Sequence, residues 1–303
     1  MRACFAAAMH GAYSQWVSAM RRGDFEAAWK IGAATLPDRS GARADDPALP
    51  YHRRQVWTGA SLEGRDVLVR CYHGLGDTIQ FARFLPALRE RARSVTVEMQ
   101  PRLVPLFLGF PGIDRLIPFD EGLPTPPPED GCAVEMMELP AALRMRPAAV
   151  PPPYLTAPPA TLPAGAIGLC WKGGDWDPDR SIPEEMMAPF ARGPAFTLVG
   201  EPTRLPLLNP EGCPMEMIAT AGLVAGAALV ITIDTMIAHL AGAMGKECWL
   251  LLRHDCDWRW AHQGNRSLWY PSLRLYRQQR SGDWSEPLAR VRRDLGRRVG
   301  TVR

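Results

Sequence analysis

The feature of this sequence that most restricts its fold is a repeated alternation of short apolar segments with segments of helical periodicity. It occurs in two blocks of the 303-residue chain. The apolar segments are DVLVRCY, SVTVEMQ, DRLIPFD and CAVEMME in the first block, and AIGLCW, AFTLVG, LVITID, ECWLLLR and SLRLYR in the second. Apolar strands that alternate with helices form parallel sheets with helices on both faces. The sequence therefore predicts an α/β protein with two such sheets.

A proline-rich stretch, 147–163, separates the two blocks and is neither a helix nor a central strand, so we expect it to be a linker. At about 150 residues per domain, the length of the chain also favours two domains. We expect the first over 50–146 and the second over 164–283, with the carboxyl ends of their strands facing a cleft. The closing segment, 284–303, is predicted to contain a helix, and one option is that it packs back on the first domain.

Residues 1–45 are predicted to form a helical hairpin. Tyr13, Trp16 and Met20 recur at helical spacing, and Gly23-Asp24 ends one helix and caps the next. The stretch 22–29 resembles the middle of a tetratricopeptide repeat, but one such unit is not stable alone because stacked repeats bury each other's faces. We interpret the hairpin as an element that docks on the domain after it. The alternative is a peptide-binding array, which would give the chain a protein partner.

Charge and apolar patterning exclude several classes of protein. The 35 basic and 32 acidic residues leave a net charge of +3, which is too balanced for a nucleic-acid-binding surface. The longest apolar run, 222–233, is shorter than the roughly 20 residues of a membrane span, and no cleavage site follows the apolar N-terminus. Seven scattered cysteines without a C-x-x-C pair predict reduced thiols, as in a cytoplasmic protein.

The first glycine-rich turn, Gly74-Leu75-Gly76-Asp77, follows the segment DVLVRCY. Glycines let the backbone approach a ligand closely, and amides at a helix N-terminus favour an anion or a polar group. The turn is not a full dinucleotide-binding motif, because Ile79 stands where the last glycine is required. Asp77 is interpreted either as the N-cap of the next helix or as a functional carboxylate.

Two basic residues follow the first strand of the second block. Lys172, one of only three lysines, precedes two glycines, and Arg180 opens the next helical segment. Both are candidates for phosphate contacts. The alternative for Lys172 is an ordinary solvated loop residue.

The segment LVITID leads directly into a helix rich in small residues. Asp234 and Thr235 stand at the junction, where the free amides of 235–237, including that of Met236, can hold a diphosphate. His239 lies one turn into this helix. It faces either the cleft or the core.

An aromatic and polar loop follows the segment ECWLLLR. Trp258 and Trp260 in this loop either stack on a sugar or base or close the core. D-x-D pairs at 175/177, 177/179 and 255/257 are of a type that binds divalent ions, but they are weak evidence because such pairs arise by chance. The cluster 254–256 lacks a fourth ligand, so we expect no metal site.

Five segments in order resemble a known family. They are GLGDTIQFARFLP (74–86), IGLCWKG (167–173), RSIP (180–183), ITIDTMIAHLAGAMGK (231–246) and DWRW with WYPSLRLYRQ (257–278). Together they are similar to bacterial tetratricopeptide-linked glycosyltransferases and to the ADP-heptose lipopolysaccharide heptosyltransferases of glycosyltransferase family 9. The resemblance covers about 50–295. It implies a GT-B architecture, with two Rossmann-like domains and the donor nucleotide held mainly by the second.

The resemblance also implies roles for particular residues. The family's catalytic aspartate falls on Asp77, the general base for an acceptor hydroxyl, and its lysine-bearing loop falls near Lys172. Gly76 falls in the family's glycine-Asp segment, and Asp234, Thr235 and His239 fall in its segment at the donor diphosphate. Gly74, Arg180 and Met236 are further candidates for donor contacts from the pattern of residues alone. The chain departs from the family in the position of Pro86 and in having Met236 where glycine is usual, which leaves the donor sugar, heptose included, open.

The implied reaction is an inverting transfer of a hexose or heptose from a nucleotide-sugar to a glycan or protein acceptor, without metal or cofactor. One base acts on the acceptor and positive groups stabilise the departing nucleotide, and we expect domain closure to exclude water. Two alternatives stay open. One is a GT-B-fold epimerase or hydrolase that acts on the nucleotide-sugar alone, and the other is a non-catalytic scaffold that binds it.

Overall fold

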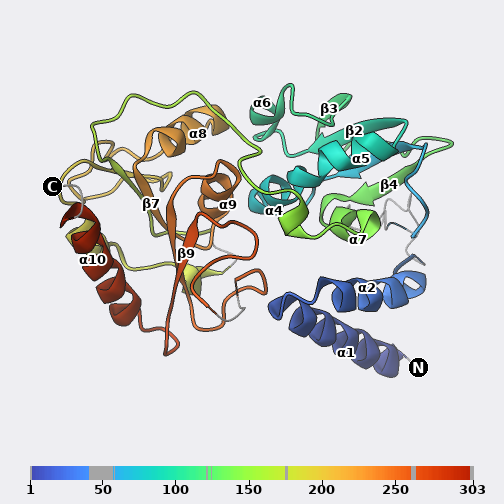
Figure 1. Ribbon diagram of the computed structural model, residues 1–303, viewed down its shortest axis with the longest axis horizontal. Helices are drawn as coiled ribbons and strands as arrows, with labels where there is room; N and C mark the ends of the chain where they lie inside the picture. Colours follow the sequence, from blue (N-terminus) through green and yellow to red (C-terminus); the bar gives the residue numbers. More distant parts are fainter. Residues whose placement is uncertain are drawn as a thin grey trace. The chain divides into compact units, whose positions relative to one another are not determined.

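The computed structural model describes residues 2–40, 57, 59–120, 122–123, 125–174, 177–260 and 264–300. The chain divides into two compact units, Met1–Val150 (unit 1) and Pro151–Arg303 (unit 2). Each unit contains one sheet whose described strands are all parallel (Figure 1). The predicted α/β class with two sheets is confirmed.

The sheet of unit 1 has four strands in the order β3-β2-β1-β4. They are β1 (Asp66–Arg70), β2 (Ser94–Met99), β3 (Arg115–Pro118) and β4 (Cys132–Glu135). The helical elements are α4 (Leu75–Phe81), η1 (Ala82–Phe84), α5 (Leu85–Arg91), α6 (Val104–Phe107), η2 (Met136–Glu138), α7 (Leu139–Leu143) and η3 (Pro147–Ala149). Central β1 is buried from its second residue onward, as its apolar sequence predicts.

The helical periodicity after the glycine-rich turn predicts one continuous helix over 77–93, and the structure corrects this. The segment begins at Leu75 and forms two short α-helices joined by the 3-10 turn η1. Pro86 lies in the first turn of α5. Proline has no backbone N–H and cannot continue a helical hydrogen-bond ladder, so the second helix has to restart here.

The N-terminal hairpin consists of α1 (Arg2–Arg21) and α2 (Phe25–Ser40). Gly23 has a positive φ of 70° and Asp24 Oδ1 accepts a hydrogen bond of 3.1 Å from the amide of Ala27, so the predicted break and cap are confirmed. Arg144, after α7, pairs with Glu26 at 2.8 Å. The hairpin therefore contacts the rest of unit 1 through this ion pair. Its kinship with tetratricopeptide repeats stays a prediction, and 41–45 lie outside the described residues.

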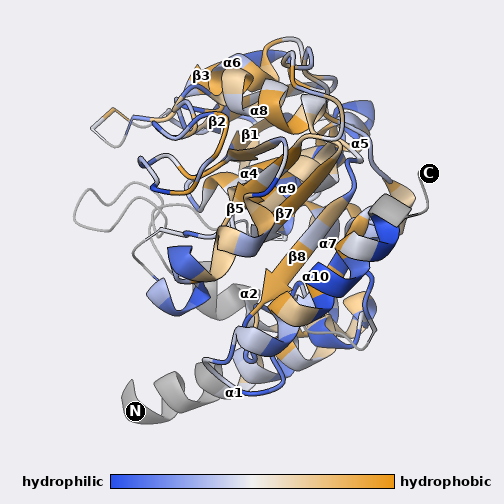
Figure 2. Cartoon of the chain, turned by 90° about the vertical axis from the view of Figure 1, so that its left-hand side faces the viewer, coloured by the Kyte–Doolittle hydropathy of each residue, from blue (hydrophilic) through white to orange (hydrophobic). Residues whose placement is uncertain are grey.

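The sheet of unit 2 has five strands in the order β6-β5-β7-β8-β9. They are β5 (Ile167–Cys170), β6 (Ala195–Thr197), β7 (Leu229–Ile233), β8 (Cys248–Leu252) and β9 (Leu273–Arg277). The helical elements are η4 (Pro178–Arg180), η5 (Glu184–Phe190), α8 (Met217–Gly226), α9 (Met236–Ala243) and α10 (Ser285–Gly300). Every residue of β7 and β8 is buried, and Figure 2 shows both strands as hydrophobic. The segment between the first two strands of this block predicts an α-helix over 182–191, but the structure has the 3-10 segment η5 there, which contains Pro189.

The proline-rich stretch packs on unit 2. The amides of Tyr154 and Leu155 both donate to the carbonyl of Ala243, at 2.9 and 3.2 Å, and Ala160 donates to Gly222 at 2.8 Å. Ala243 ends α9, so its carbonyl has no partner within the helix. From Pro151 onward the stretch is thus a strap along unit 2. Its first residues, Pro147–Ala149, form the 3-10 turn η3 of unit 1, which corrects the expectation that the whole stretch is non-helical.

Helix α10 packs on β8 and β9 of its own unit. Asp294 accepts a hydrogen bond from the Tyr276 hydroxyl at 3.0 Å and pairs with Arg274 at 2.7 Å, and Arg298 pairs with Glu247 at 3.0 Å. These contacts all lie within unit 2, and the option that this helix packs back on the first domain stays a prediction. No helix among the described residues has the length and apolarity required to cross a bilayer.

Gly242 of α9 offers a test of close packing in unit 2. A Cβ built at this position would overlap the fully buried ring of Tyr270, whereas a Cβ at Gly296 of α10 meets nothing within 4 Å. We expect Gly242→Ala to lower the free energy of unfolding by about 1–3 kcal/mol, as overpacking does. Gly296→Ala, the matched control, should leave it unchanged or raise it, because alanine favours helix. Equal unfolding free energies for the two variants in denaturant titrations would contradict this packing.

Candidate functional site

The carboxyl ends of the strands of unit 2 bring several predicted residues to one edge of the sheet. Lys172 follows β5 and Asp234 follows β7, as predicted. Arg253, which follows β8, was not singled out from the sequence, although its place at the end of an apolar strand is the signal that marks it. In parallel sheets this edge is where ligands bind.

Arg180 ties the loops at this edge together. Its guanidinium is buried; Nη1 donates to the carbonyl of Asp234 at 2.8 Å and Nε donates to that of Asp177 at 3.3 Å. The Asp177 carboxylate lies 3.6 Å from Arg180 Nε and accepts a 3.0 Å hydrogen bond from Arg253. Two guanidinium groups thus share one carboxylate, which places a concentration of positive charge beside the junction of β7 and α9.

Thr235 caps α9 at this junction. Its Oγ1 accepts a 3.3 Å hydrogen bond from the amide of Ile237, so the expectation that this amide is free is wrong. Helix geometry leaves the amide of Met236 without a partner inside the helix. The positive end of the helix dipole and this amide favour an anion here.

Asp234 is held in an unusual electrostatic setting. Desolvation raises the pKa of its carboxyl group from an ordinary value of 3.8 to about 6, and the negative charge of Asp257 acts in the same direction. The nearby charges of Arg259 and Arg180 oppose the rise. The carboxyl group is therefore partly protonated just below neutral pH, and in that form it donates a hydrogen bond to an anion rather than repelling it.

Lys172 is half-exposed and forms an ion pair with Glu201, which follows β6 and is largely exposed. Exposed ion pairs contribute little free energy, so a phosphate group can compete for this lysine at small cost. The backbone next to it is anchored, because the amide of Gly173 donates to Ser181 Oγ at 3.1 Å. Lys172 is thus a partly exposed cation beside an anchored glycine.

Three predicted ligand contacts lie in the core of unit 2. The His239 ring is 5% exposed, its Nδ1 lies 3.2 Å from the Tyr270 hydroxyl, and its centroid lies 5.3 Å from that of Trp260. Trp260 is fully buried, and Trp258 is covered by Arg259, whose guanidinium lies 4.3 Å from the ring centroid. Stacking of the two tryptophans on a sugar or base is therefore contradicted. Both close the core, because burial of their large apolar rings is more favourable than exposure.

The described aspartates of the D-x-D pairs do not converge on a metal site. Asp177 and Asp257 are paired with arginines, and Asp175 lies outside the described residues. Within the described part of the chain, no group of three or more His, Cys, Asp and Glu side chains has the arrangement of a metal site.

In unit 1 the glycine-rich turn lies at the carboxyl end of β1. Gly74 occupies the N-cap position of α4, and Asp77 is the third helical residue after it. The interpretation of Asp77 as the N-cap is therefore wrong. The half-exposed Asp77 instead lies in the first turn, and its Oδ2 accepts a 3.0 Å hydrogen bond from the Gly74 amide. Gly76, the second residue of α4, leaves the backbone next to Asp77 without a side chain.

Polar residues from the neighbouring strands surround this turn. Thr78 Oγ1 donates to Gln100 Oε1 at 2.9 Å, and Gln100 Nε2 donates to the carbonyl of His73 at 2.7 Å. His73 Nε2 lies 3.6 Å from Glu135 Oε1. His73, Gln100 and Glu135 were not singled out from the sequence, although Gln100 ends the apolar segment SVTVEMQ and Glu135 lies within CAVEMME. Their positions bring them to the edge that holds Asp77.

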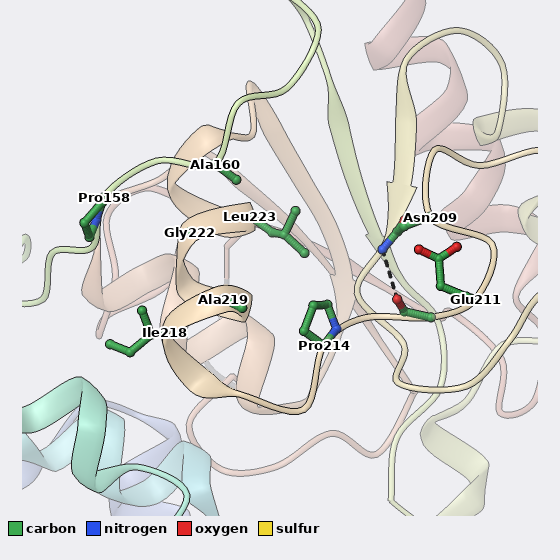
Figure 3. Close-up of a pocket in the computed structure, with 10 residues that line it drawn as sticks. Pro158, Ala160, Asn209, Glu211, Pro214, Ile218, Ala219, Gly222 and Leu223 are labelled. Atoms are coloured by element: carbon green, nitrogen blue, oxygen red, sulfur yellow. Dashed lines mark hydrogen bonds between the residues drawn. The ribbon is translucent and has the colours of Figure 1, made fainter.

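Unit 2 also contains a pocket of about 380 Å³ between α8 and the loop after β6 (Figure 3). Asn209 Nδ2 donates to the carbonyl of Gly212 at 3.3 Å on one side, and Ile218 and Leu223 of α8 line the other. None of the predicted site residues lines it. The candidate sites are therefore the two sheet edges, not this pocket.

Comparison with curated proteins gives a relative by sequence. No protein-family model matches the chain. Protein FlbA of Caulobacter vibrioides (strain ATCC 19089 / CIP 103742 / CB 15) is 25% identical over 285 residues, which covers 78% of this chain and 47% of FlbA. The chain thus spans about half the length of this curated relative.

Three solved structures with a similar fold are described as glycosyltransferases. A glycosyl transferase family 9 protein from Veillonella parvula DSM 2008 superposes with a TM-score of 0.52 at 14% identity, over 80% of this chain and 98% of that one. E. coli heptosyltransferase WaaC with ADP gives 0.51 at 13% identity, over 77% and 99%. The iron-containing dodecameric glycosyltransferase TibC from enterotoxigenic E. coli H10407 gives 0.51 at 12%, over 75% and 67%. The chain therefore has the fold of these enzymes.

The raised pKa of Asp234 predicts a pH-dependent contribution to stability. The folded state binds a proton that the unfolded state has released between pH 4 and 6, so this contribution falls as pH rises through that range, by at most about 3 kcal/mol. Asp234→Asn removes this pH-dependent contribution, because the asparagine side chain does not bind a proton in this range. We expect the melting temperature of the wild type relative to the variant to decrease from pH 4 to pH 7. A constant difference over that range would contradict the burial of this carboxylate.

Proposed function

We propose that this chain, which has the two-unit α/β fold of the family 9 glycosyltransferases, transfers a sugar from a nucleotide-sugar to an acceptor hydroxyl with inversion. The observation that carries the proposal is the division of chemistry between the units. The edge of the sheet in unit 2 gathers cations and a helix N-terminus, whereas that in unit 1 presents a half-exposed carboxylate on a glycine-rich turn. A transferase needs both: a site for a diphosphate and a base for the acceptor.

In the proposed reaction the donor diphosphate binds at the start of α9. The amide of Met236 and the helix dipole stabilise its charge, with Lys172 and Arg180 as the cations. Arg180 is already fixed by the carbonyl of Asp234, so it costs little ordering entropy when it binds a phosphate. As the bond to the anomeric carbon breaks, these groups stabilise the negative charge on the leaving nucleotide.

Asp77 is the proposed general base. It accepts the proton of the acceptor hydroxyl while the oxygen forms the new bond to the anomeric carbon and the nucleotide diphosphate leaves with the bonding electron pair. The Gly74 amide holds one carboxylate oxygen at 3.0 Å, which fixes the orientation of the group toward the acceptor. Glycines at 74 and 76 leave room for a ligand close to the backbone.

The proposed transfer uses no metal, because the cations of unit 2 take its place in stabilising the diphosphate. The solved neighbour TibC is described as iron-containing, so this part of the proposal needs its own control.

A second proposal concerns the N-terminal hairpin, which we infer is a surface for a protein partner. Its support is that α2 docks on unit 1 through Glu26 while Tyr13 of α1 stays largely exposed.

A nucleotide panel tests the donor site. We expect one of ADP, UDP, GDP or CMP, or its sugar conjugate, to raise the melting temperature selectively, since ligand at 100 times its dissociation constant stabilises by about 2.7 kcal/mol. Arg180→Lys should reduce that shift, because lysine cannot make the forked contacts of arginine. Absence of a shift with every compound would favour a chain that does not bind nucleotide-sugars.

Asp77→Asn separates a catalyst from a scaffold. Asparagine still accepts the hydrogen bond from the Gly74 amide, so the turn should fold and the donor should bind, but it cannot take a proton. We expect turnover to fall by about 10²–10⁴-fold with an unchanged nucleotide shift. Full activity in the variant would exclude Asp77 as the base.

Two controls accompany this assay. Turnover in EDTA should match that with added Mg²⁺ or Mn²⁺, whereas restoration by metal would refute the metal-independent reaction. Product analysis with donor alone identifies an epimerase or hydrolase, which would change the donor without an acceptor.

A further inference from the structure

His73 is an ordered but accessible imidazole at the carboxyl edge of the sheet in unit 1. Its ring centroid lies 4.7 Å from that of Tyr72, its Nε2 lies 3.6 Å from Glu135 Oε1, and its carbonyl accepts a 2.7 Å hydrogen bond from Gln100. The side chain nevertheless remains 45% exposed. The contacts fix its orientation while leaving part of the ring open to a ligand.

His73 and Asp77 flank the same peptide group. The Gly74 nitrogen bonds Asp77 Oδ2 at 3.0 Å, and this nitrogen belongs to the peptide that His73 begins. Covalent geometry then places Asp77 Oδ2 within about 5.5 Å of the His73 Cα. One small molecule that binds over Gly74 can touch both side chains.

Glu135 is positioned by the sheet itself. It ends β4, in register with Arg70 of β1, and its side chain is only 9% exposed. Arg70 in turn is in register with Glu98 of β2 and donates to the carbonyl of Thr125 at 2.5 Å. A buried carboxylate held in this way orients an adjacent imidazole.

We propose that His73, oriented by Glu135, is a second acceptor-binding residue beside Asp77, and that it contacts the hydroxyl adjacent to the one that attacks. The acceptor is then a sugar ring with neighbouring hydroxyls, not the single hydroxyl of a serine or threonine. This inference rests on the proposed function and narrows its acceptor. A site built to hydrogen-bond a substrate hydroxyl discriminates strongly against a compound that lacks it, because its polar group is left unpaired.

The test is binding to unit 1 in the full chain, measured by saturation-transfer NMR. The probes are the methyl glycosides of glucose, galactose and mannose, with N-acetylserinamide as the single-hydroxyl comparison. We expect at least one glycoside to bind, and binding to weaken about tenfold in His73→Ala and several-fold in Glu135→Gln. His254→Ala, which removes an exposed histidine of unit 2, is the matched control and should not change it.

If His73→Ala fails to fold, Glu135→Gln still tests the inference, because glutamine has nearly the volume of glutamate and the imidazole of His73 stays in place. In that variant the pH dependence of glycoside binding between pH 5 and 8 should also change, which a purely structural effect would not produce. Melting temperatures confirm that each variant is folded.

The outcomes separate this inference from the proposed function. Glycoside binding that depends on His73, without sugar transfer, would refute only the proposed function. Glycoside binding unaffected in both variants, no glycoside binding at all, or preferential binding of N-acetylserinamide would overturn the inference even if the chain transfers sugar.

Discussion

Parallel strand pairing is the constraint from which the candidate sites follow. In both sheets every described pair of strands is parallel, so each strand must be followed by a connection that returns the chain to the opposite edge. All residues that immediately follow a strand then lie at one edge. This is why Asp77 and Gln100, 23 residues apart in sequence, share one hydrogen-bonded group through Thr78 and His73.

Electrostatics gives each edge its own chemistry. In unit 2, Arg180 and Arg253 share the carboxylate of Asp177, and the loops after three strands are thereby held together. In unit 1 the buried cation Arg70 lies between Glu98 and Glu135 across three adjacent strands. Buried charges persist only when paired or hydrogen-bonded, so these arrangements fix the positions of the half-exposed groups beside them.

Several residues that suggested a ligand serve the core instead. His239, Trp260 and Tyr270 form one buried aromatic group, and the absence of a side chain at Gly242 lets α9 approach the Tyr270 ring. The proline-rich stretch behaves similarly: it reads as a linker, but its non-proline amides bond the last carbonyl of α9 and a carbonyl of α8. In each case the local sequence pattern was compatible with two roles, and the packing of unit 2 determines which of them the residues have.

The sequence by itself determined the class of fold, the two sheets, the break at Gly23-Asp24 and the placement of Lys172, Asp234 and Asp77 at strand ends, because apolar periodicity and turn residues act over short distances. Only the tertiary structure decided which side chains meet. The pairing of Arg180 with the carbonyl of Asp234, of Lys172 with Glu201 and of His73 with Glu135 joins positions 29 to 62 residues apart. Such contacts depend on the order and register of strands, which a local pattern does not specify.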